Sequence, residues 1–236
     1  MSNSTQIISW KLLRSSFQPH CSHMQWDREQ FEAFQEDDTP LLRFYSFQAP
    51  TITIGRLEVQ QGHRIPSHVP IDVRPTGGRA VYHGSKDLCY SVMAPCWNSQ
   101  VGGSLLESYL KISRILQAAF LALGKNVELA SHRIPTQKAK HCFSSPSYAE
   151  LLLHDKKIAG GAQCRRQNVF LQQGVILLDV DPEWECLSPE WRGEGMAGLN
   201  YENEQYISRP QLEAAIIKSF EACGIGWLEY DFHNGK

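Results

Sequence analysis

Residues 73–84, VRPTGGRAVYHG, place two adjacent glycines between the apolar runs VPIDV and AVYH. Loops that hold phosphates are also glycine-rich, but they normally open into a helix, whereas strand-like runs flank this loop on both sides. The loop alone fits two interpretations. In the first, it is the turn of a β-hairpin whose glycines adopt positive φ and whose arginine faces water. In the second, a ligand approaches the glycine backbone and an arginine holds its carbonyl, carboxylate or phosphate group.

The chain on either side of this loop predicts many strands and a few helices. Apolar runs separated by glycine, proline and serine predict strands at 6–13, 41–48, 51–55, 69–73, 80–83, 88–94, 126–130 and 169–181, and two strands with a turn in 149–163. Helical spacing predicts helices at 22–35, 105–124 and 210–224. Ser104 and Glu107 form a capping-box pattern at the start of the second helix, whose predicted apolar face includes Leu106. The sequence therefore predicts an α+β fold in a single domain over residues 1–236.

Composition narrows the class of protein. With 236 residues and 42% hydrophobic side chains, the chain is expected to bury roughly 70–75% of its unfolded surface, without disulfide or metal staples. The net charge of −2 gives no overall attraction to nucleic acid or to an anionic membrane. No apolar run is long enough for a signal peptide or a membrane span. The seven cysteines include no C-x-x-C pair, so we expect no metal site and a reducing, cytoplasmic environment.

Two segments carry residues with potential chemistry. Cys142 lies in KHCFSSPSYAEL, directly after Lys138, Lys140 and His141. Cationic neighbours lower the pKa of a thiol and enrich the nucleophilic thiolate, although a single cysteine is more often a small buried apolar residue. The second segment is HDKKIAGGAQ, residues 154–163. Its two lysines are either the solvated tip of a hairpin turn or, for the second of them, an amine held against an apolar wall with a lowered pKa.

Taken in order, the segments RPTGGRAVYH, CFSSPSYAEL and KKIAGGAQCRRQNVFLQQGVILLDVD resemble the biotin/lipoate protein ligase and octanoyltransferase superfamily over roughly residues 40–182. The resemblance implies a mixed, largely antiparallel β-sheet flanked by helices. It also implies an acyl-binding tunnel walled by the glycine loop and the lysine strand. The substrate-binding residues implied are Arg74, Gly77, Gly78, Arg79, His83, Gly160 and Gly161.

Two chemistries occur in this superfamily, and the sequence is more similar to one of them. ATP-dependent lipoate ligases carry S-G-G-G-A-V-x-H in the loop and R-N-D-[IL] before the lysine strand, where this chain has Arg79 in the loop and PSYAEL before the strand. Cysteine-dependent octanoyltransferases share T-G-G-R-A-V-x-H and C-F-x-x-P-S-x-[YA]-E-L. On this resemblance Cys142 is the acyl-accepting nucleophile and Lys157 its partner. The larger ligases add a C-terminal accessory domain, which we do not expect here.

The implied activity moves an octanoyl or lipoyl group from acyl carrier protein, through a Cys142 thioester, to a lysine of a lipoyl domain. The implied acceptors are the glycine-cleavage H protein and the acyltransferase subunits of 2-oxoacid dehydrogenases. No cofactor is required in this interpretation. Two alternatives stay open: a lipoate ligase that uses ATP and Mg through lipoyl-AMP, and a non-catalytic binder of lipoyl domains. The basic residues Arg133, Lys138, Lys140, His141, Arg165 and Arg166 are candidates for docking acidic partners.

Overall fold

The computed structural model describes residues 8–15, 22–57, 69–131, 147–180, 196–201 and 205–229. Its large sheet has the strand order β11-β1-β2-β6-β10-β9-β8-β7, and a smaller sheet has the order β4-β3-β5. The strands of the large sheet are β1 (Ile8–Ser15), β2 (Leu41–Tyr45), β6 (Leu88–Pro95), β7 (Glu128–Leu129), β8 (Leu151–Leu153), β9 (Lys156–Arg166), β10 (Val169–Ile176) and β11 (Ile225–Glu229). The smaller sheet comprises β3 (Thr51–Gly55), β4 (Ile71–Arg74) and β5 (Val81–His83). The helices are α1 (His23–Ala33), α2 (Leu105–Ala122) and α4 (Arg209–Glu221).

The pairing of the large sheet is mixed. Strand β1 pairs in parallel with β2 and β11, whereas the neighbours from β2 through β6, β10, β9 and β8 to β7 pair antiparallel. This arrangement confirms the predicted α+β class with a mixed, largely antiparallel sheet. Strand β11 was not predicted, because IGWLE directly follows Gly224, at which the predicted helix ends, and its parallel pairing with β1 is a long-range contact.

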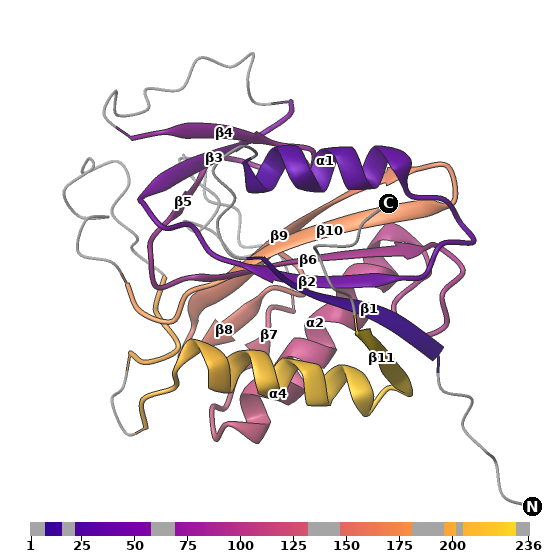
Figure 1. Cartoon of the computed structure of the whole chain (residues 1–236). Helices are drawn as coiled ribbons and strands as arrows, with labels where there is room; N and C mark the ends of the chain where they lie inside the picture. Colours follow the sequence, from indigo (N-terminus) through magenta and orange to yellow (C-terminus); the bar gives the residue numbers. More distant parts are fainter. Residues whose placement is uncertain are drawn as a thin grey trace, which may run out of the picture.

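Helices cover both faces of the large sheet. Figure 1 shows α1 and the smaller sheet on one side of it, and α2 and α4 on the other. The alternation of β6 explains this layering, because successive side chains of a strand point to opposite faces. Leu88, Tyr90, Val92 and Ala94 join the core cluster under α2 and α4. Met93 points the other way and packs in the cluster that contains Phe31 of α1 and Phe34 just beyond it.

The smaller sheet corrects the hairpin interpretation of the glycine loop. Strands β4 and β5 do not pair with each other, because β3 lies between them, parallel to β4 and antiparallel to β5. Residues 75–80 therefore cross over β3 rather than form a tight turn. The loop packs so closely on β3 that position 55 must be a glycine, because a Cβ on Gly55 would lie 2.2 Å from the carbonyl oxygen of Gly78.

Helix α2 begins as predicted but buries a different face in its first turn. The capping box is present: the Ser104 side chain accepts from the backbone of Glu107, whose carboxylate accepts from the backbone of Ser104. Leu106, however, is 52% exposed, and the buried stripe starts at Ser108 and continues through Ile112 and Leu116. Leu106 is two residues from Ser108, about 200° around the helix, so it points away from that stripe. No helix in the described part of the chain is long and apolar enough to cross a membrane.

Candidate functional site

A pocket lies between the large sheet and the smaller one. Its empty volume is about 410 Å³, including space open to solvent. One wall is the backbone of 160–162 in β9 and 173–175 in β10. Apolar or aromatic side chains of Met24, Tyr45 and Val81 contribute further lining. The pocket therefore suits a narrow apolar ligand that approaches a strand backbone closely.

Arg74 lines this pocket and also fixes the glycine loop. Its guanidinium donates to the carbonyl oxygens of Gly77 (2.9 Å from Nη2) and Thr53 (2.9 Å from Nη1), and to that of Arg79. These contacts hold the loop against β3. Gly78 takes φ +93°, which side-chain-bearing residues rarely adopt, and space is open within 4 Å of a Cβ placed on Gly77. The structure thus brings Arg74 together with Gly77, Gly78 and the carbonyl oxygen of Arg79, and their role in substrate binding stays a prediction.

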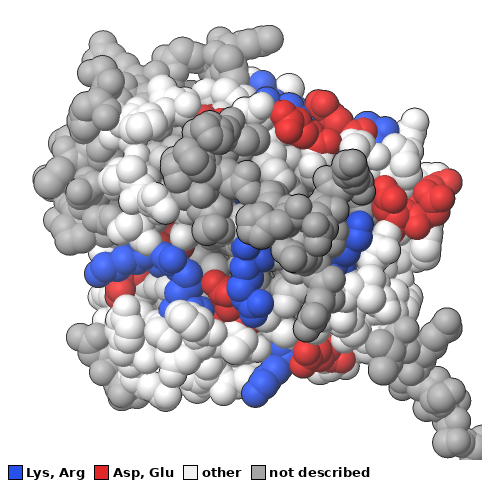
Figure 2. Space-filling model, viewed as in Figure 1, with Lys and Arg blue, Asp and Glu red and all other residues white. Residues whose placement is uncertain are grey.

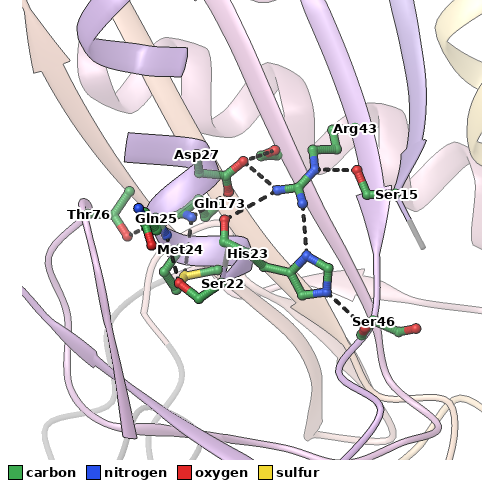
Figure 3. A network of polar contacts seen from close by, with 11 residues as sticks. Ser15, Ser22, His23, Met24, Gln25, Asp27, Arg43, Ser46, Thr76 and Gln173 are labelled. Atoms are coloured by element: carbon green, nitrogen blue, oxygen red, sulfur yellow. Dashed lines mark hydrogen bonds and ion pairs between the residues drawn. The ribbon is translucent and has the colours of Figure 1, made fainter. Parts of the chain in front are cut away.

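Figure 3 shows a buried polar network that connects the loop to α1 and β2. Thr76 Oγ1 donates to Gln173 Oε1 (2.9 Å), and Gln173 Nε2 donates to Asp27 Oδ2 (2.6 Å). The other oxygen of Asp27 forms an ion pair with Arg43 Nη1 at 2.7 Å. Arg43 Nη2 in turn lies 2.8 Å from His23 Nδ1. This chain of contacts, here called the Asp27 network, places the loop relative to the strands that wall the pocket.

Sequence reasoning did not identify the Asp27 network. Asp27 is fully buried on the inner face of α1, and Arg43 is 2% exposed in β2. A charged residue on the apolar face of a predicted helix is the one signal that the sequence offers, since such residues are buried almost only when paired. Burial and the nearby Arg43 lower the pKa of His23 to about 4, so its ring is neutral at pH 7. A neutral ring accepts at Nδ1 from Arg43 and donates from Nε2 to Ser46 O (3.1 Å).

His83 forms part of the pocket lining from β5. Its Nε2 is 2.8 Å from Thr53 Oγ1, and its ring stacks on Phe47 with centroids 4.5 Å apart. Burial, followed by the positive charge of Arg74 and by that of His23 when its ring is also protonated, lowers the pKa of His83 to about 3. The imidazole is therefore uncharged at neutral pH, and its place in the pocket is that of a shape-defining side chain.

Lys157 is fully buried, so the interpretation of this lysine as the solvated tip of a turn is wrong. The tip is His154 and Asp155, both with positive φ (50° and 61°), and Lys157 is the second residue of β9. Its Nζ forms an ion pair with Glu150 Oε1 at 2.8 Å. The second oxygen of Glu150 accepts from the backbone N–H of Ser147 at 2.6 Å. A buried ammonium needs such a partner, because an isolated charge in a protein interior is strongly unfavourable.

Gly160 provides the space for this ion pair. A Cβ placed on Gly160 would lie 2.6 Å from Cε and 2.8 Å from Nζ of Lys157, and 3.3 Å from Glu150 Oε1. Because Gly160 and Gly161 also line the pocket, the lysine ammonium lies next to the pocket lining. Sequence reasoning named Lys157 and both glycines but missed Glu150, which lies within the quoted CFSSPSYAEL segment.

The predicted nucleophile Cys142 lies outside the described residues, as do Arg133, Lys138, Lys140 and His141. The structure describes residues 147–151 of that motif, in which Glu150 contacts Lys157 and the backbone of Ser147 donates to Glu150. In the described part of the chain, no three His, Cys, Asp or Glu side chains form a group that could hold a metal ion.

Residues 20–222 match the lipoyl protein ligase A/B catalytic domain family. The chain belongs to this family. Among curated relatives, the octanoyltransferase LipM of Carboxydothermus hydrogenoformans is 36% identical over 155 residues, which cover 64% of this chain and 57% of that protein. The octanoyltransferase LipM of Kyrpidia tusciae is 33% identical, with 74% of this chain and 68% of that protein covered. The corresponding Staphylococcus aureus protein is 30% identical, with 77% and 74% covered.

Solved structures of proteins described as lipoate-protein ligases have the same fold. The putative lipoate protein ligase of T. acidophilum with bound lipoic acid superposes with a TM-score of 0.72 at 20% identity, over 94% of this chain and 88% of that one. A lipoate-protein ligase A bound with ATP gives a TM-score of 0.70 at 22% identity, over the same shares. These similarities confirm the predicted fold. The matched part of the chain spans between 57% and 74% of the length of these three curated relatives.

Proposed function

We propose that this protein is an octanoyltransferase of lipoate metabolism that moves an acyl group through a thioester on Cys142 to a lysine of a lipoyl domain. Two observations support the proposal together. The chain is similar over most of its length to proteins named octanoyltransferase LipM. The observation that carries it structurally is the Lys157–Glu150 pair next to the glycines that line an apolar pocket.

The proposed reaction has two steps and needs no nucleotide. In the first, the Cys142 thiolate attacks the carbonyl carbon of an octanoyl thioester on acyl carrier protein. The carrier sulfur leaves with the electron pair and takes up a proton. In the second, the neutral amine of the acceptor lysine attacks the acyl-cysteine, the Cys142 sulfur leaves, and the amine proton passes to it. Thioester exchange is nearly neutral in energy and amide formation is favourable, so ATP and Mg are not required.

Lys157 has two candidate roles: orienting the acyl carbonyl, and taking a proton from the incoming amine. The carboxylate of Glu150 at 2.8 Å supports the first role, because it compensates the ammonium form for its burial. An ammonium donates hydrogen bonds and stabilises the oxyanion that develops in each tetrahedral intermediate. Glu150 is then a positioning residue that acts through Lys157. Backbone amides of Gly77 and Gly78 are further candidate donors to the oxyanion.

The pocket accounts for acyl selection in this proposal. Its lining by Met24, Val81 and Val175 offers apolar contact but few polar groups. Burial of each methylene contributes about 0.8 kcal/mol, so an octanoyl chain binds firmly without charged contacts. The proposed acceptors are lipoyl domains, including those of the glycine-cleavage H protein and the 2-oxoacid dehydrogenases.

Intact-mass measurement tests the proposal directly. The protein is mixed with octanoyl-acyl carrier protein in the absence of ATP, alongside Cys142→Ala and Cys223→Ala variants. Cys223 is an exposed free thiol on the α4 side and serves as the matched control. We expect one octanoyl adduct on the wild type and on Cys223→Ala, removed by hydroxylamine and missing from Cys142→Ala. An adduct retained by Cys142→Ala, or modification of lipoyl domain only when lipoate and ATP are added, would contradict the proposal.

A further inference from the structure

A second hollow with several arginines adjoins the glycine loop. It has an empty volume of about 700 Å³, including space open to solvent. Arg28 of α1, Arg56 after β3 and Arg166 at the end of β9 line it, and Glu32 is the one carboxylate in the lining. We call these three arginines and the hollow between them the arginine groove. Arg165 also lines the groove but donates from Nη2 to Ser108 Oγ on the α2 side (2.7 Å), so its guanidinium is engaged there.

Hydrogen bonds within the protein do not neutralise the charges of these arginines. Arg166 Nη2 donates to Phe34 O at 2.7 Å, at the C-terminal end of α1, and Arg28 Nη2 donates to Val73 O at 2.6 Å. Each guanidinium carries five donors, and a carbonyl oxygen brings no full negative charge. Among the described residues, no carboxylate forms an ion pair with Arg28, Arg56 or Arg166. The groove therefore concentrates positive charge in a protein whose net charge is −2.

The position of the groove relates it to the pocket. Arg74 lines both hollows, and Pro75, the next residue, lines the groove at the start of the glycine loop. Figure 2 shows acidic and basic side chains interspersed on the face that it views, without a continuous field of one sign. The groove is thus a local concentration of cations beside an apolar pocket. A ligand that fits both has an apolar chain at one end and an anion further along the same molecule.

We infer that the arginine groove binds the phosphate ester of a phosphopantetheine arm while the acyl group carried by that arm lies in the pocket. This inference rests on the proposed function, which requires an acyl thioester as donor. Guanidinium groups bind phosphate oxygens with paired, charge-assisted hydrogen bonds, and three of them surround the groove. A phosphopantetheine thioester and an acyl-adenylate both combine a phosphate with an acyl group. We assign the phosphate in the groove to the thioester, because the thioester is the donor of the proposed reaction.

A matched pair of donors tests the assignment. Octanoyl-phosphopantetheine and octanoyl-pantetheine present the same thioester and differ in the phosphate alone. Initial rates are measured with wild type, Arg56→Gln, Arg28→Gln and the control Arg114→Gln, whose arginine is exposed on α2. Arg56 is the cleaner variant, because the described residues give its side chain no hydrogen bond that its loss would break. We expect Arg56→Gln to raise KM about tenfold for the phosphorylated donor and to leave KM for the other donor unchanged.

Three results would overturn the inference. In the first, the ratio of the two KM values is the same in Arg56→Gln, Arg28→Gln and wild type. In the second, the variants weaken use or binding of octanoyl-adenylate but not of octanoyl-phosphopantetheine, which assigns the groove to a nucleotide. In the third, KM for octanoyl-phosphopantetheine does not rise with ionic strength, although exposed charge pairs are screened over about 10 Å at 0.1 M salt.

Calorimetric titration keeps the inference separate from the proposed function. Pantetheine 4′-phosphate and pantetheine are titrated into each protein, with no reaction required. We expect the phosphate to strengthen binding to wild type and to Arg114→Gln, and to give about tenfold less advantage in Arg56→Gln. If the protein shows these affinities but transfers no acyl group, the assignment of the groove stands and the proposed reaction is refuted. Equal affinity of wild type for both compounds would refute the inference that the groove binds the phosphate.

Discussion

Two glycine pairs are needed near the pocket for different physical reasons: Gly160–Gly161 lines it, and Gly78 lies next to the lining residues Arg74 and Ala162. The pair Gly77–Gly78 lies in the loop that crosses β3, and the pair Gly160–Gly161 lies within β9. Gly78 has φ +93°, so its constraint is conformational. Gly160 is extended within its strand, so its constraint is space: the position of its missing Cβ is 2.6 Å from Cε of Lys157. The same dipeptide thus shapes a backbone in one place and accommodates an ion pair in the other.

This difference separates binding from chemistry within the site. The loop is held by Arg74 and, through Thr76, by the Asp27 network, which fixes the shape of the pocket. The strand pair instead lets the Lys157 ammonium lie against the pocket wall. Changes at the loop should therefore act mainly on stability and donor affinity. Changes at the strand should act mainly on turnover.

The largest expected effect is that of Gly160→Ala. The added methyl group displaces the Lys157 ammonium from Glu150, and we expect kcat to fall about 100-fold with KM nearly unchanged, a loss of about 2.7 kcal/mol in transition-state stabilisation. Steady-state octanoyl transfer measures this change. Glu150→Gln is the companion variant, because it keeps the shape of the side chain but removes its charge.

The two variants distinguish a positioning role from a purely structural one. A positioning role predicts that both lower kcat at temperatures well below their unfolding midpoints. If both variants show the kcat of wild type after correction for their folded fractions, the ion pair has a structural role only. Changes at the β9 glycines would then not act on turnover. Circular dichroism at the assay temperature supplies the folded fraction.

The sequence predicted the parts of this contrast that depend on local pattern. Apolar runs and the capping box located most strands and α2, and the motifs identified Gly77, Gly78, Gly160 and Lys157. Glu150 was missed because it is seven residues before Lys157 and meets it only through the β8–β9 hairpin, where the register shifts between Leu151 and Leu152. The pairing of β3 between β4 and β5 was missed for the same reason: strand order is a long-range property.

Acidification should affect the loop side more than the strand side. The folded-state pKa of His83 is about 3, below the unfolded value of 6.5, so the stability that its burial contributes is complete above pH 6.5 and decreases as the pH falls toward 3. At pH 5 we expect the free energy of unfolding to be about 2 kcal/mol lower than at pH 7 from this residue alone. Urea unfolding of wild type and His83→Gln at both pH values measures the difference.

The His83→Gln variant isolates the contribution of this residue to the acid sensitivity. It should lose about 2 kcal/mol of the change in unfolding free energy that wild type shows between pH 7 and pH 5. An unchanged pH dependence in His83→Gln would show that the acid sensitivity arises elsewhere.

Gly78→Ala should have a smaller effect, and one of a different kind from Gly160→Ala. An alanine at φ +93° is strained by about 1–2 kcal/mol, and its Cβ would lie 2.9 Å from Nη2 of Arg74, which binds the loop carbonyls. We expect the free energy of unfolding to fall by that amount, KM for the donor to rise several-fold, and kcat to change little. Denaturant unfolding and steady-state kinetics check both parts. A large fall in kcat with unchanged KM would mean that the loop, like the strand, acts in the chemical step.

Gly77→Ala gives the smallest expected effect on folding and the sharpest test of what the loop is for. A Cβ on Gly77 meets no atom within 4 Å, and its φ lies outside the left-handed region, so the unfolding free energy should change by no more than about 0.5 kcal/mol. The open space beside Gly77 has room for close approach of the donor to the backbone. If it serves that purpose, the methyl group raises KM for octanoyl-phosphopantetheine in a protein as stable as wild type. Unchanged KM and unchanged stability would mean that Gly78 alone carries the requirement for glycine in this loop, and that substrate contacts lie on the β9 side of the pocket.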